Sequence, residues 1–559
     1  MTQLHTTSAP GTGSAAGTGN RTIPSYLIIA VLTILTIGPQ YFLNVSFILN
    51  QTLIQNTLTA SSKGLLLLSI VSNLAFALCV PIGPAVTRRY GIRRSYPAFM
   101  LVFLLGSLLN MFAPGMELLL LGRILQGFAS GSLFLTILPV SLRSFPNRVR
   151  NRFLLLAIGG LFGSSAIGAL LGSLSLTSDT WRWLFAVSAV TSALCLLIGP
   201  SALPAQPSPQ TPRPPLDKSG IVSLALFMSA LTVPLYYLQE KGLGSLYVWP
   251  FFLICLLLLI LFLTVDYAKE NPLLPWKALL FSKPVFGTVM SIASHISLII
   301  ALAGTNGVLR SVREIPFMNL TFFYLWFFTG ILVSALLCTV LYDRLGPGIL
   351  GFVGSLAVIA VSLQWLHLDV KVPLSTMYLQ IACLGGGISM TLISGALGTA
   401  MAGNLHHAAL RSVSLHFMRN LAGAVAAPFV GWFLYRQSAI HYETFRSQMS
   451  VTNPALNVKM SELAGHLMAG GLTASEAKKS AASTLLVEVK KSALLGAYQN
   501  LFTILLVLGI VMLLASFGKA LTGKGRSLVQ KEQAPKAQSA QDPVPVLALP
   551  QPLAEPAGR

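Results

Sequence analysis

Fourteen long apolar segments run through this 559-residue chain and restrict its fold more than any other feature. A segment of about 20 mostly apolar residues crosses the hydrocarbon core of a bilayer as a helix, which satisfies its own backbone polar groups there. The predicted spans are residues 26–48, 64–83, 97–113, 118–140, 153–174, 183–203, 220–239, 248–266, 284–303, 320–341, 348–366, 374–400, 413–435 and 497–517. We therefore expect an all-α integral membrane protein with about fourteen transmembrane helices.

The balance of residue types excludes a soluble protein. Hydrophobic residues make up 54% of the chain and charged residues only 9%, whereas soluble domains have roughly 25% charged residues. The net charge is +21, from 37 basic and 16 acidic residues. In a membrane protein this excess is typical of Lys and Arg in loops beside anionic lipid, and we expect no nucleic-acid partner.

Neither a cofactor nor a metal site is indicated. Five cysteines, Cys79, Cys195, Cys255, Cys338 and Cys383, lie inside apolar segments without the spacing of a disulfide framework or a zinc site. The chain also has no G-x-x-x-x-G-K-[ST] motif for binding ATP. The expected partners are membrane lipid, a small-molecule substrate and protons.

Loop charge predicts the orientation in the membrane. An even number of spans places both termini on one side. Loops on that side include 88–94, 143–152 and the segment with Lys269, Lys277 and Lys283, which together contain eleven Lys and Arg. The six short loops opposite contain six. The positive-inside rule therefore predicts cytoplasmic termini and a cytoplasmic, or inner, membrane.

Composition also divides the chain into regions. The predicted regions are a disordered cytoplasmic tail (1–24), a six-helix bundle (25–203), a Pro-rich cytoplasmic linker (204–219), two extra helices with a cytoplasmic segment (220–283), a second six-helix bundle (284–518) and a disordered cytoplasmic tail (519–559). The second bundle includes a polar periplasmic loop, 436–496, with helical amphipathic stretches. We interpret this loop as a periplasmic cap; the alternative is a hairpin that binds a periplasmic partner.

An internal repeat relates the two bundles. VPIGPAVTRRYGIRR (80–94) and TVLYDRLGPGILG (339–351) both follow an apolar segment and align with an offset of 255 residues, so that Arg89 corresponds to Arg344. Parallel repeats of this kind occur in carriers whose two bundles rock about a cavity near the middle of the bilayer. The sequence therefore favours such a carrier.

A polar motif interrupts the fourth predicted span, in LGRILQGFASG (121–131). Arg123 and Gln126 lie three residues apart and therefore on one helix face, and Gly127 permits close helix packing. A buried intramembrane Arg is costly and usually functional. The alternative is that Arg123 only ties helices together through backbone carbonyls.

Further motifs follow in order: TWRWLFAV (180–187), Asp217 with Gly220, NPLLPWKALLFSKPVFG (271–287) and MRNLAGAVAAPFVG (418–431). With the R-x-x-Q-G sequence at Arg123, they resemble the 14-helix drug:proton antiporter branch of the major facilitator superfamily over about residues 26–517. The resemblance implies two six-helix bundles, two extra central helices, alternating access, and a part for Arg123 in proton coupling.

Two spans depart from the pattern of that branch. The fifth has IGALLG (167–172), with Ala169 where the family has Pro, although a small-residue face remains in Gly160, Gly163, Gly168 and Gly172. In the first span, Asn44 stands closest to the position of the family's Asp. An amide can hydrogen-bond a substrate but cannot take up a proton near neutral pH.

Proton coupling therefore needs other groups. We assign all 16 acidic residues to tails, loops and helix ends. The intramembrane candidates are His295 and His416, because imidazole titrates near neutral pH; either could instead be a structural hydrogen-bonding group. Glu314, near the outer mouth, is a third candidate. An anionic or neutral cargo would sit more comfortably beside Arg123 and Arg419 than a cation would.

The repeated turn is the predicted cytoplasmic gate, formed by Arg88, Arg89, Gly91, Arg93, Arg94, Asp343, Arg344 and Gly346. The family's turn reads Gly-x-x-x-Asp-Arg-x-Gly, but the first copy here has Pro84 and Arg88 in place of Gly and Asp, with Gly83 one position early. One interpretation is drift in a tolerant loop. The other is an asymmetric latch carried by Asp343 and Arg344, with Arg88 facing lipid phosphate.

An aromatic run, FFYLWFF (322–328), has two interpretations. Aromatic residues gather at membrane interfaces, so the run could belong to an interfacial belt. It could instead line a lipophilic binding site.

The primary functional hypothesis is a secondary active exporter that moves amphipathic small molecules outward by alternating access, with the proton antiport that the resemblance implies. The alternative keeps the fold but exports a siderophore, a lipid-like molecule or an anionic metabolite with weak or no proton coupling. A third hypothesis is a transport-inactive membrane sensor or scaffold. None of these is an enzyme.

Overall fold

A computed structural model describes residues 24–178, 180–204, 215–270, 272–402, 408–448, 454–525 and 527–528. Every regular element in these ranges is helical, and 14 helices are long and apolar enough to cross a membrane, which confirms the predicted fold class. The spanning helices are α1 (Ser25–Leu49), α3 (Ser62–Tyr90), α4 (Ile92–Met111), α5 (Met116–Ser144), α6 (Arg152–Thr177), α7 (Arg182–Ala202), α8 (Lys218–Lys241), α9 (Trp249–Tyr267), α10 (Ser282–Gly307), α11 (Phe317–Leu345), α12 (Pro347–Trp365), α13 (Leu374–Ala400), α14 (Ala408–Gln448) and α16 (Ala474–Leu521). The shorter elements are α2 (Gln51–Thr57), α15 (Pro454–Ala469), the 3₁₀ helices η1 (Asn147–Val149) and η2 (Trp276–Ala278), and the π-helix η3 (Val308–Val312).

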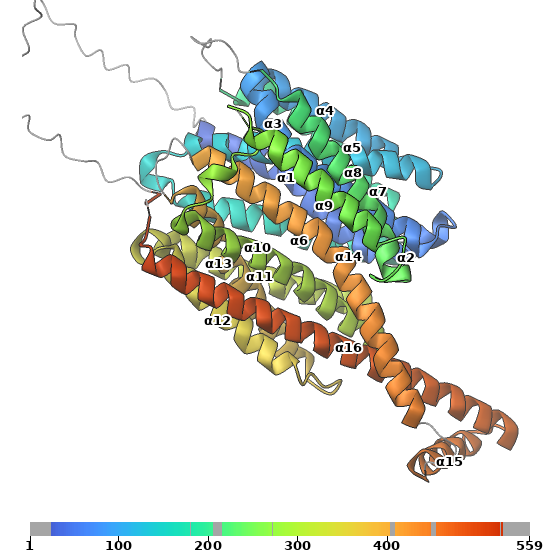
Figure 1. Ribbon diagram of the computed structural model, residues 1–559. Coiled ribbons are helices and arrows are strands. Elements are labelled where there is room, and N and C mark those ends of the chain that lie inside the picture. The colour runs from blue at the N-terminus through green and yellow to red at the C-terminus, as the bar shows by residue number, and fades with distance from the viewer. Residues whose placement is uncertain are drawn as a thin grey trace, which may run out of the picture.

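The two halves repeat one packing scheme (Figure 1). In the first half α3 packs on α5 and α4 on α7; in the second, the corresponding α11 packs on α13 and α12 on α16. The halves meet along two equivalent seams, α3 with α14 and α6 with α11. This arrangement is what a parallel repeat predicts.

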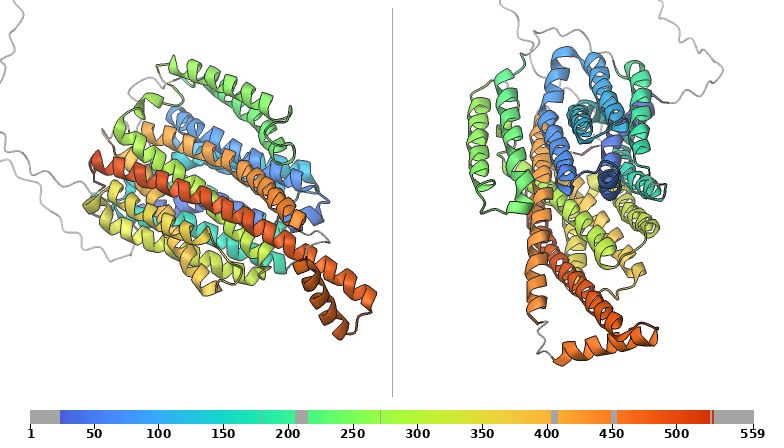
Figure 2. Two further views of the ribbon diagram at one scale, coloured as in Figure 1. Left: turned by 60° about the horizontal axis from the view of Figure 1, so that its bottom comes forward. Right: turned by 90° about the vertical axis from the view of Figure 1, so that its right-hand side faces the viewer.

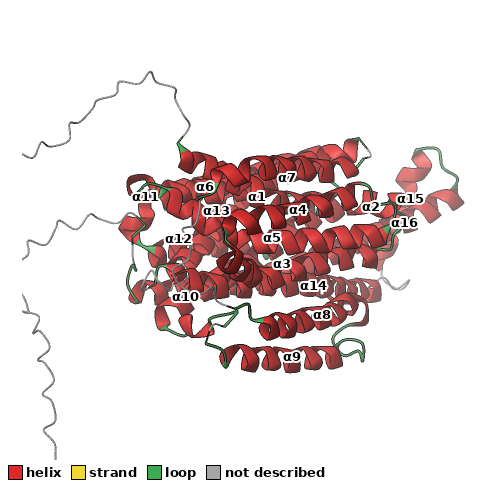
Figure 3. Ribbon diagram, turned by 90° about the horizontal axis from the view of Figure 1, so that it is seen from above, coloured by secondary structure: helices red, strands yellow, loops and turns green. Residues whose placement is uncertain are grey.

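The two extra helices cover one of the seams. α8 packs against both α3 and α14, and α9 packs on α8 at the outer edge of the molecule (Figure 3). The α8 start is fixed by Asp217, whose Oδ1 accepts from the Gly220 N–H and from Lys269 Nζ. Burial opposes ionisation of this carboxyl, but these hydrogen bonds outweigh it, so the pKa of Asp217 is lowered. The Asp-x-x-Gly motif therefore acts as a helix N-cap.

The chain runs so that α1 begins and α16 ends on one side of the bundle, here called the terminal side. On the opposite, hairpin side, α14 and α16 continue past the bundle and join through α15 (Figures 1 and 2). Residues 436–448 and 474–496 are therefore continuations of α14 and α16; the predicted helical stretches are present, but they are not confined to a separate loop. α15 packs on α16, and the hairpin projects away from the bundle instead of capping it (Figure 1).

The predicted tails need one revision. Residues 1–23, 205–214 and 529–559, to which disorder and linker character were assigned, lie outside the described residues. The start of the predicted C-terminal tail does not behave as one, because α16 extends to Leu521 and Lys519 is completely buried. Lys519 Nζ donates to the Lys283 and Gly398 carbonyl oxygens.

Candidate functional site

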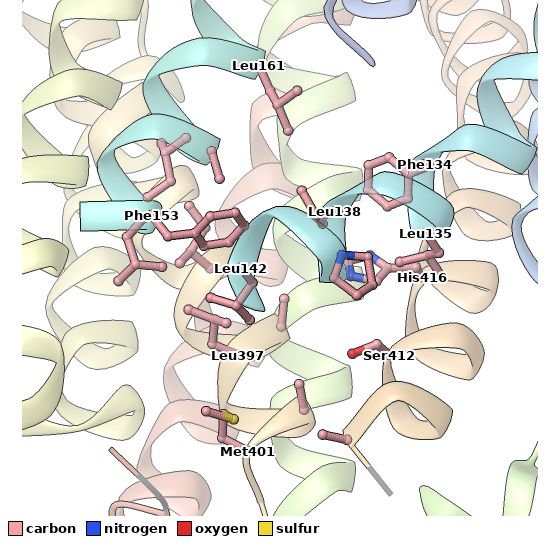
Figure 4. Close-up of a pocket in the computed structure, with 18 of the residues that line it drawn as sticks. Phe134, Leu135, Leu138, Leu142, Phe153, Leu161, Leu397, Met401, Ser412 and His416 are labelled. Atoms are coloured by element: carbon pink, nitrogen blue, oxygen red, sulfur yellow. The ribbon is translucent and has the colours of Figure 1, made fainter. Parts of the chain in front are cut away.

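Two cavities lie between the halves. The terminal cavity, of about 410 Å³, is lined by α5 and α6 from the first half and α13 and α14 from the second (Figure 4). The hairpin cavity, of about 340 Å³, is lined by α1, α3, α5 and α6 from the first half and α10, α11 and α14 from the second. Each cavity is therefore lined by helices of both six-helix bundles.

A thin layer of side chains separates the cavities. Tyr41 and Phe162 line both, with ring centroids 6.4 Å apart. Arg419, on α14, is 6% exposed. It interacts with the side chain of Tyr41, on α1, and lies 5.6 Å from the centroid of the Phe134 ring. We call Tyr41, Phe162 and Arg419 the waist.

The terminal cavity is apolar with a cationic mouth. Leu138, Phe153, Leu161 and Leu397 are among its walls (Figure 4), and most of its remaining lining is also apolar. Arg143 and Arg150, at the terminal ends of α5 and η1, also line it. Ser412 and His416 are polar groups deeper inside. The cavity suits an amphipathic molecule.

The hairpin cavity is more polar. Its hydrogen-bonding side chains include Gln40, Asn44, Asn73, Arg123, His295 and Asn420. Tyr324, Phe327 and Phe328 form an aromatic wall, whereas Phe322 and Trp326 are 52% and 44% exposed on the outside of α11. Part of the aromatic run therefore lines the cavity and part lies on the outside of the helix, because successive residues on a helix point in different directions.

Arg123 is the centre of a buried polar network. Its Nη2 donates to Asn44 Oδ1 at 3.3 Å, its Nη1 donates to Gln126 Oε1 at 3.3 Å, and its guanidinium lies 5.1 Å from the centroid of the Phe47 ring. Gln126 also accepts from Asn110 Nδ2 and donates to Ser107 Oγ. Among the described residues, the hydrogen bonds of the Arg123 guanidinium go to the side chains of Asn44 and Gln126, so the alternative role in binding backbone carbonyls gains no support.

Among the described residues, no carboxylate lines either cavity. Glu117, Asp217, Glu240, Asp266 and Asp343 lie at helix ends. Glu314 pairs with Lys491 at the base of the hairpin and lines neither cavity, so it is poorly placed for the proton role considered above. Four guanidiniums therefore line the cavities, Arg123 in the hairpin cavity and Arg143, Arg150 and Arg419 in the terminal cavity, and no anionic side chain among the described residues of either lining balances them.

The two histidines flank the waist from opposite cavities. His416 lines the terminal cavity, where its ring packs edge-on against Phe134 with centroids 5.2 Å apart. His295 lines the hairpin cavity and faces Gly423, where a Cβ would lie 2.5 Å from its Nε2. Gly423, from the stretch MRNLAGAVAAPFVG (418–431), thus leaves room for this imidazole.

The repeated turns share one backbone conformation. Gly91 and Gly346 have φ values of 82° and 84°, a region in which a side chain is strained. In the first copy Arg88, Arg93 and Arg94 are exposed, and Arg93 Nε donates to the Leu203 carbonyl oxygen.

The remaining residues of the predicted gate differ in their contacts. Arg89 lies 5.7 Å from the centroid of the neighbouring Tyr90 ring. In the second copy Asp343 Oδ1 accepts from the Leu528 N–H, and the Arg344 carbonyl oxygen accepts from Lys524 Nζ. The two copies therefore share one turn conformation but form different contacts.

The predicted packing glycines lie where neighbouring helices approach one another. A Cβ at Gly160, Gly168 or Gly172 would collide with or crowd α1, whereas one at Gly163 would meet Phe328 of α11 at 3.4 Å. The four glycines are thus not a single face, because Gly163 faces α11 whereas the other three face α1. Gly127 and Gly83 allow close contact between α3 and α5, so Gly83 does keep the helices close despite Pro84.

The sequence reasoning missed Tyr41, Gln40, Asn73, Asn420 and Leu528. The first four are polar residues inside apolar spans, a signal that was available in PQYFLN, SNLAF and MRNLAG. Leu528 gave no local signal, because its burial depends on contacts between residues distant in sequence.

Comparisons with known proteins agree on one family. Residues 27–427 match the family model of the Major Facilitator Superfamily. The chain is 33% identical over 415 residues, 74% of this chain and 81% of the relative, to the uncharacterized MFS-type transporter YubD of Bacillus subtilis (strain 168). It is 22% identical over 402 residues, 68% and 75% of the two chains, to the multidrug export protein EmrB of Haemophilus influenzae. The fold is similar, with a TM-score of 0.51 at 13% identity and coverage of 89% and 97%, to a bacterial homologue of the human lysosomal transporter Spinster, solved in an inward-facing, unoccupied conformation.

Proposed function

Because the chain belongs to the major facilitator superfamily of transporters, we propose that it is a secondary active exporter of amphipathic small molecules. The observation that carries this proposal is the pair of cavities between the halves, separated by the waist. Rocking of the halves about the two seams would open one cavity while closing the other, as alternating access requires.

Loop charge supports the direction of the pathway. The basic loops containing Arg88, Arg143 and Arg150 lie on the terminal side, which we therefore propose to be cytoplasmic in the inner membrane. A relative named as a multidrug export protein supports outward transport. The apolar terminal cavity with its cationic mouth would then receive cargo from the cytoplasm.

The charges favour an anionic or neutral cargo over a cation. Two unit charges about 4 Å apart interact by about 4 kcal/mol at an effective dielectric constant of about 20. A cation beside Arg123 or Arg419 would be repelled by an energy of this order, and an anion would be attracted. The carboxylate-free cavities thus favour the second candidate function, export of an amphipathic anion with weak or no proton coupling. If protons are coupled, we propose His295 and His416 as the groups that bind them, because each lines a cavity.

A substrate panel in proteoliposomes tests this proposal. The purified protein is assayed with organic anions, neutral amphiphiles and cationic dyes, under a pH gradient and a voltage imposed separately. We expect transport of anions and neutral molecules to exceed that of cations by about tenfold or more, with Arg123→Ala abolishing the preference. Transport of cations driven by the pH gradient alone would support proton antiport and overturn the anionic candidate. Absence of transport for the whole panel would count against the exporter itself.

A further inference from the structure

The segment that follows α16 turns back under the second half. Residues 522–525 and 527–528 are described, and Leu528 is only 1% exposed. Leu528 lines the terminal cavity beside Met401, Ala408 and Arg150, which lie at the terminal ends of their elements. A residue seven positions beyond a transmembrane helix is thus buried at the mouth of the transport pathway.

Two hydrogen bonds hold this segment on the second repeated turn. The Leu528 N–H donates to Asp343 Oδ1 at 2.8 Å, and Lys524 Nζ donates to the Arg344 carbonyl oxygen at 2.6 Å. A hydrogen bond to a carboxylate is stronger than one between neutral groups. Gly346 in the same turn leaves room for the segment, because a Cβ there would lie 2.9 Å from Lys524 Cγ.

The start of the segment is also fixed. Lys519, in the last turn of α16, donates to the carbonyl oxygens of Lys283 at 2.9 Å and Gly398 at 2.8 Å. These bonds tie the end of α16 to α10 and α13. The segment therefore leaves α16 from a defined place and direction, with Asp343 as its far anchor.

We propose that the described residues 522–525 and 527–528 form a gate segment, which closes the mouth of the terminal cavity while Asp343 holds Leu528 in place. Cargo reaching the terminal cavity from the terminal side must displace Leu528, so the segment competes with cargo for the mouth. The docking stands on the contacts alone; only its effect on transport rests on the proposed function.

The proposal explains why the two repeated turns differ in charge. Only the second turn has a carboxylate, at Asp343, that can accept the Leu528 N–H. Arg88 stands at the corresponding position of the first turn, and a guanidinium has no acceptor. The acid is therefore present in the copy whose turn holds Leu528.

Thiol labelling tests the docking without any transport assay. Cys383 is the exposed native cysteine and the other four are buried, so Leu528→Cys is placed in a Cys383→Ser background and labelled with a charged maleimide. We expect slow labelling that accelerates about fivefold or more when Asp343→Asn is added. Asp369→Asn, at the opposite side of the membrane, is the matched control and should leave the rate unchanged. Equal rates with and without Asp343→Asn would overturn the docking.

Transport by a shortened chain tests the competition. A chain ending at Thr522 keeps α16 and Lys519, and at low cargo concentration we expect its uptake from the terminal side to be about fivefold faster, the factor that corresponds to roughly 1 kcal/mol. Leu528→Asp should act in the same direction at full length. Unchanged or slower transport by a monodisperse shortened chain would overturn the gate. If neither chain transports any cargo, the proposed function fails, while labelling still decides the docking.

Discussion

At the scale of single residues, the polarity of the hairpin cavity depends on Asn44. Its Oδ1 accepts from Arg123 Nη2 and, at 3.4 Å, from Gln40 Nε2. An Asp of the same shape could accept both bonds and would also neutralise the guanidinium. The family's acid and this chain's amide thus differ in charge more than in geometry, and under the proposed function this charge selects the cargo.

We predict that Asn44→Asp lowers anion transport by about tenfold or more and makes the remaining transport depend on pH. The new carboxylate would pair with Arg123 and remove the charge that attracts an anion, since a pair at this distance outweighs a cargo group farther away. Initial rates in proteoliposomes between pH 5 and 8 measure the effect. Asn500→Asp, on the hairpin stem outside both cavities, is the control; an equal loss there would indicate general damage.

At the scale of helices, α6 depends on contact with two partners. Gly160, Gly168 and Gly172 place it against α1 within the first half, and Gly163 faces Phe328 across the α6–α11 seam. One helix therefore belongs rigidly to its own bundle through one face and contacts the other bundle through a second. Ala169, which stands where the family has Pro, is fully buried beside Leu49 and Tyr324. The helix therefore lacks the kink that a proline would cause at this position.

We predict that Gly168→Ala destabilises the protein by about 1–3 kcal/mol, the usual range for overpacking. The added methyl group would collide with the Phe42 carbonyl oxygen, which belongs to a helix backbone and cannot rotate away. Gly163→Ala should be nearly neutral, because its methyl would only touch the Phe328 ring. Thermal unfolding in detergent compares the two. A similar loss of stability in both variants would contradict the assignment of the faces.

At the scale of the whole molecule, transport requires that the two cavities never join. The waist prevents this with Tyr41 of α1, Phe162 of α6 and Arg419 of α14, so both halves contribute to one barrier. The seams α3–α14 and α6–α11 are equivalent in the repeat, but α8 covers only the first. The two extra helices thus make one side of the molecule thicker than the other.

We predict that Phe162→Ala connects the cavities and lets cargo leak down its gradient. Proteoliposomes loaded with cargo should empty about tenfold faster than with the unchanged protein, without any imposed gradient of protons or voltage. Phe322→Ala, on the exposed face of α11, removes a similar ring outside the pathway and should not leak. Intact retention with Phe162→Ala would show that Tyr41 and Arg419 suffice as the barrier.

Local features predicted much of the architecture. Span number, the halves and the motif at Arg123 follow from residues near one another, because apolar length and i to i+3 spacing are local properties. The hairpin was predicted as a loop with helical stretches, and its continuity with the spanning helices was missed for the same reason: apolarity marks only the part of a helix that lies in lipid. Polar residues 474–496 continue α16 beyond the membrane, and hydropathy cannot detect that continuation.

By itself, the sequence determined that the chain is a fourteen-helix membrane protein of repeated halves with basic loops and few acids, because those properties depend on composition and short-range spacing. Only the tertiary structure decided which polar groups share a cavity, that Tyr41 meets Arg419 at the waist, and that Asp343 holds Leu528. Those partners come from helices and segments far apart in the chain. Their meeting depends on how whole helices pack, and no local pattern records it.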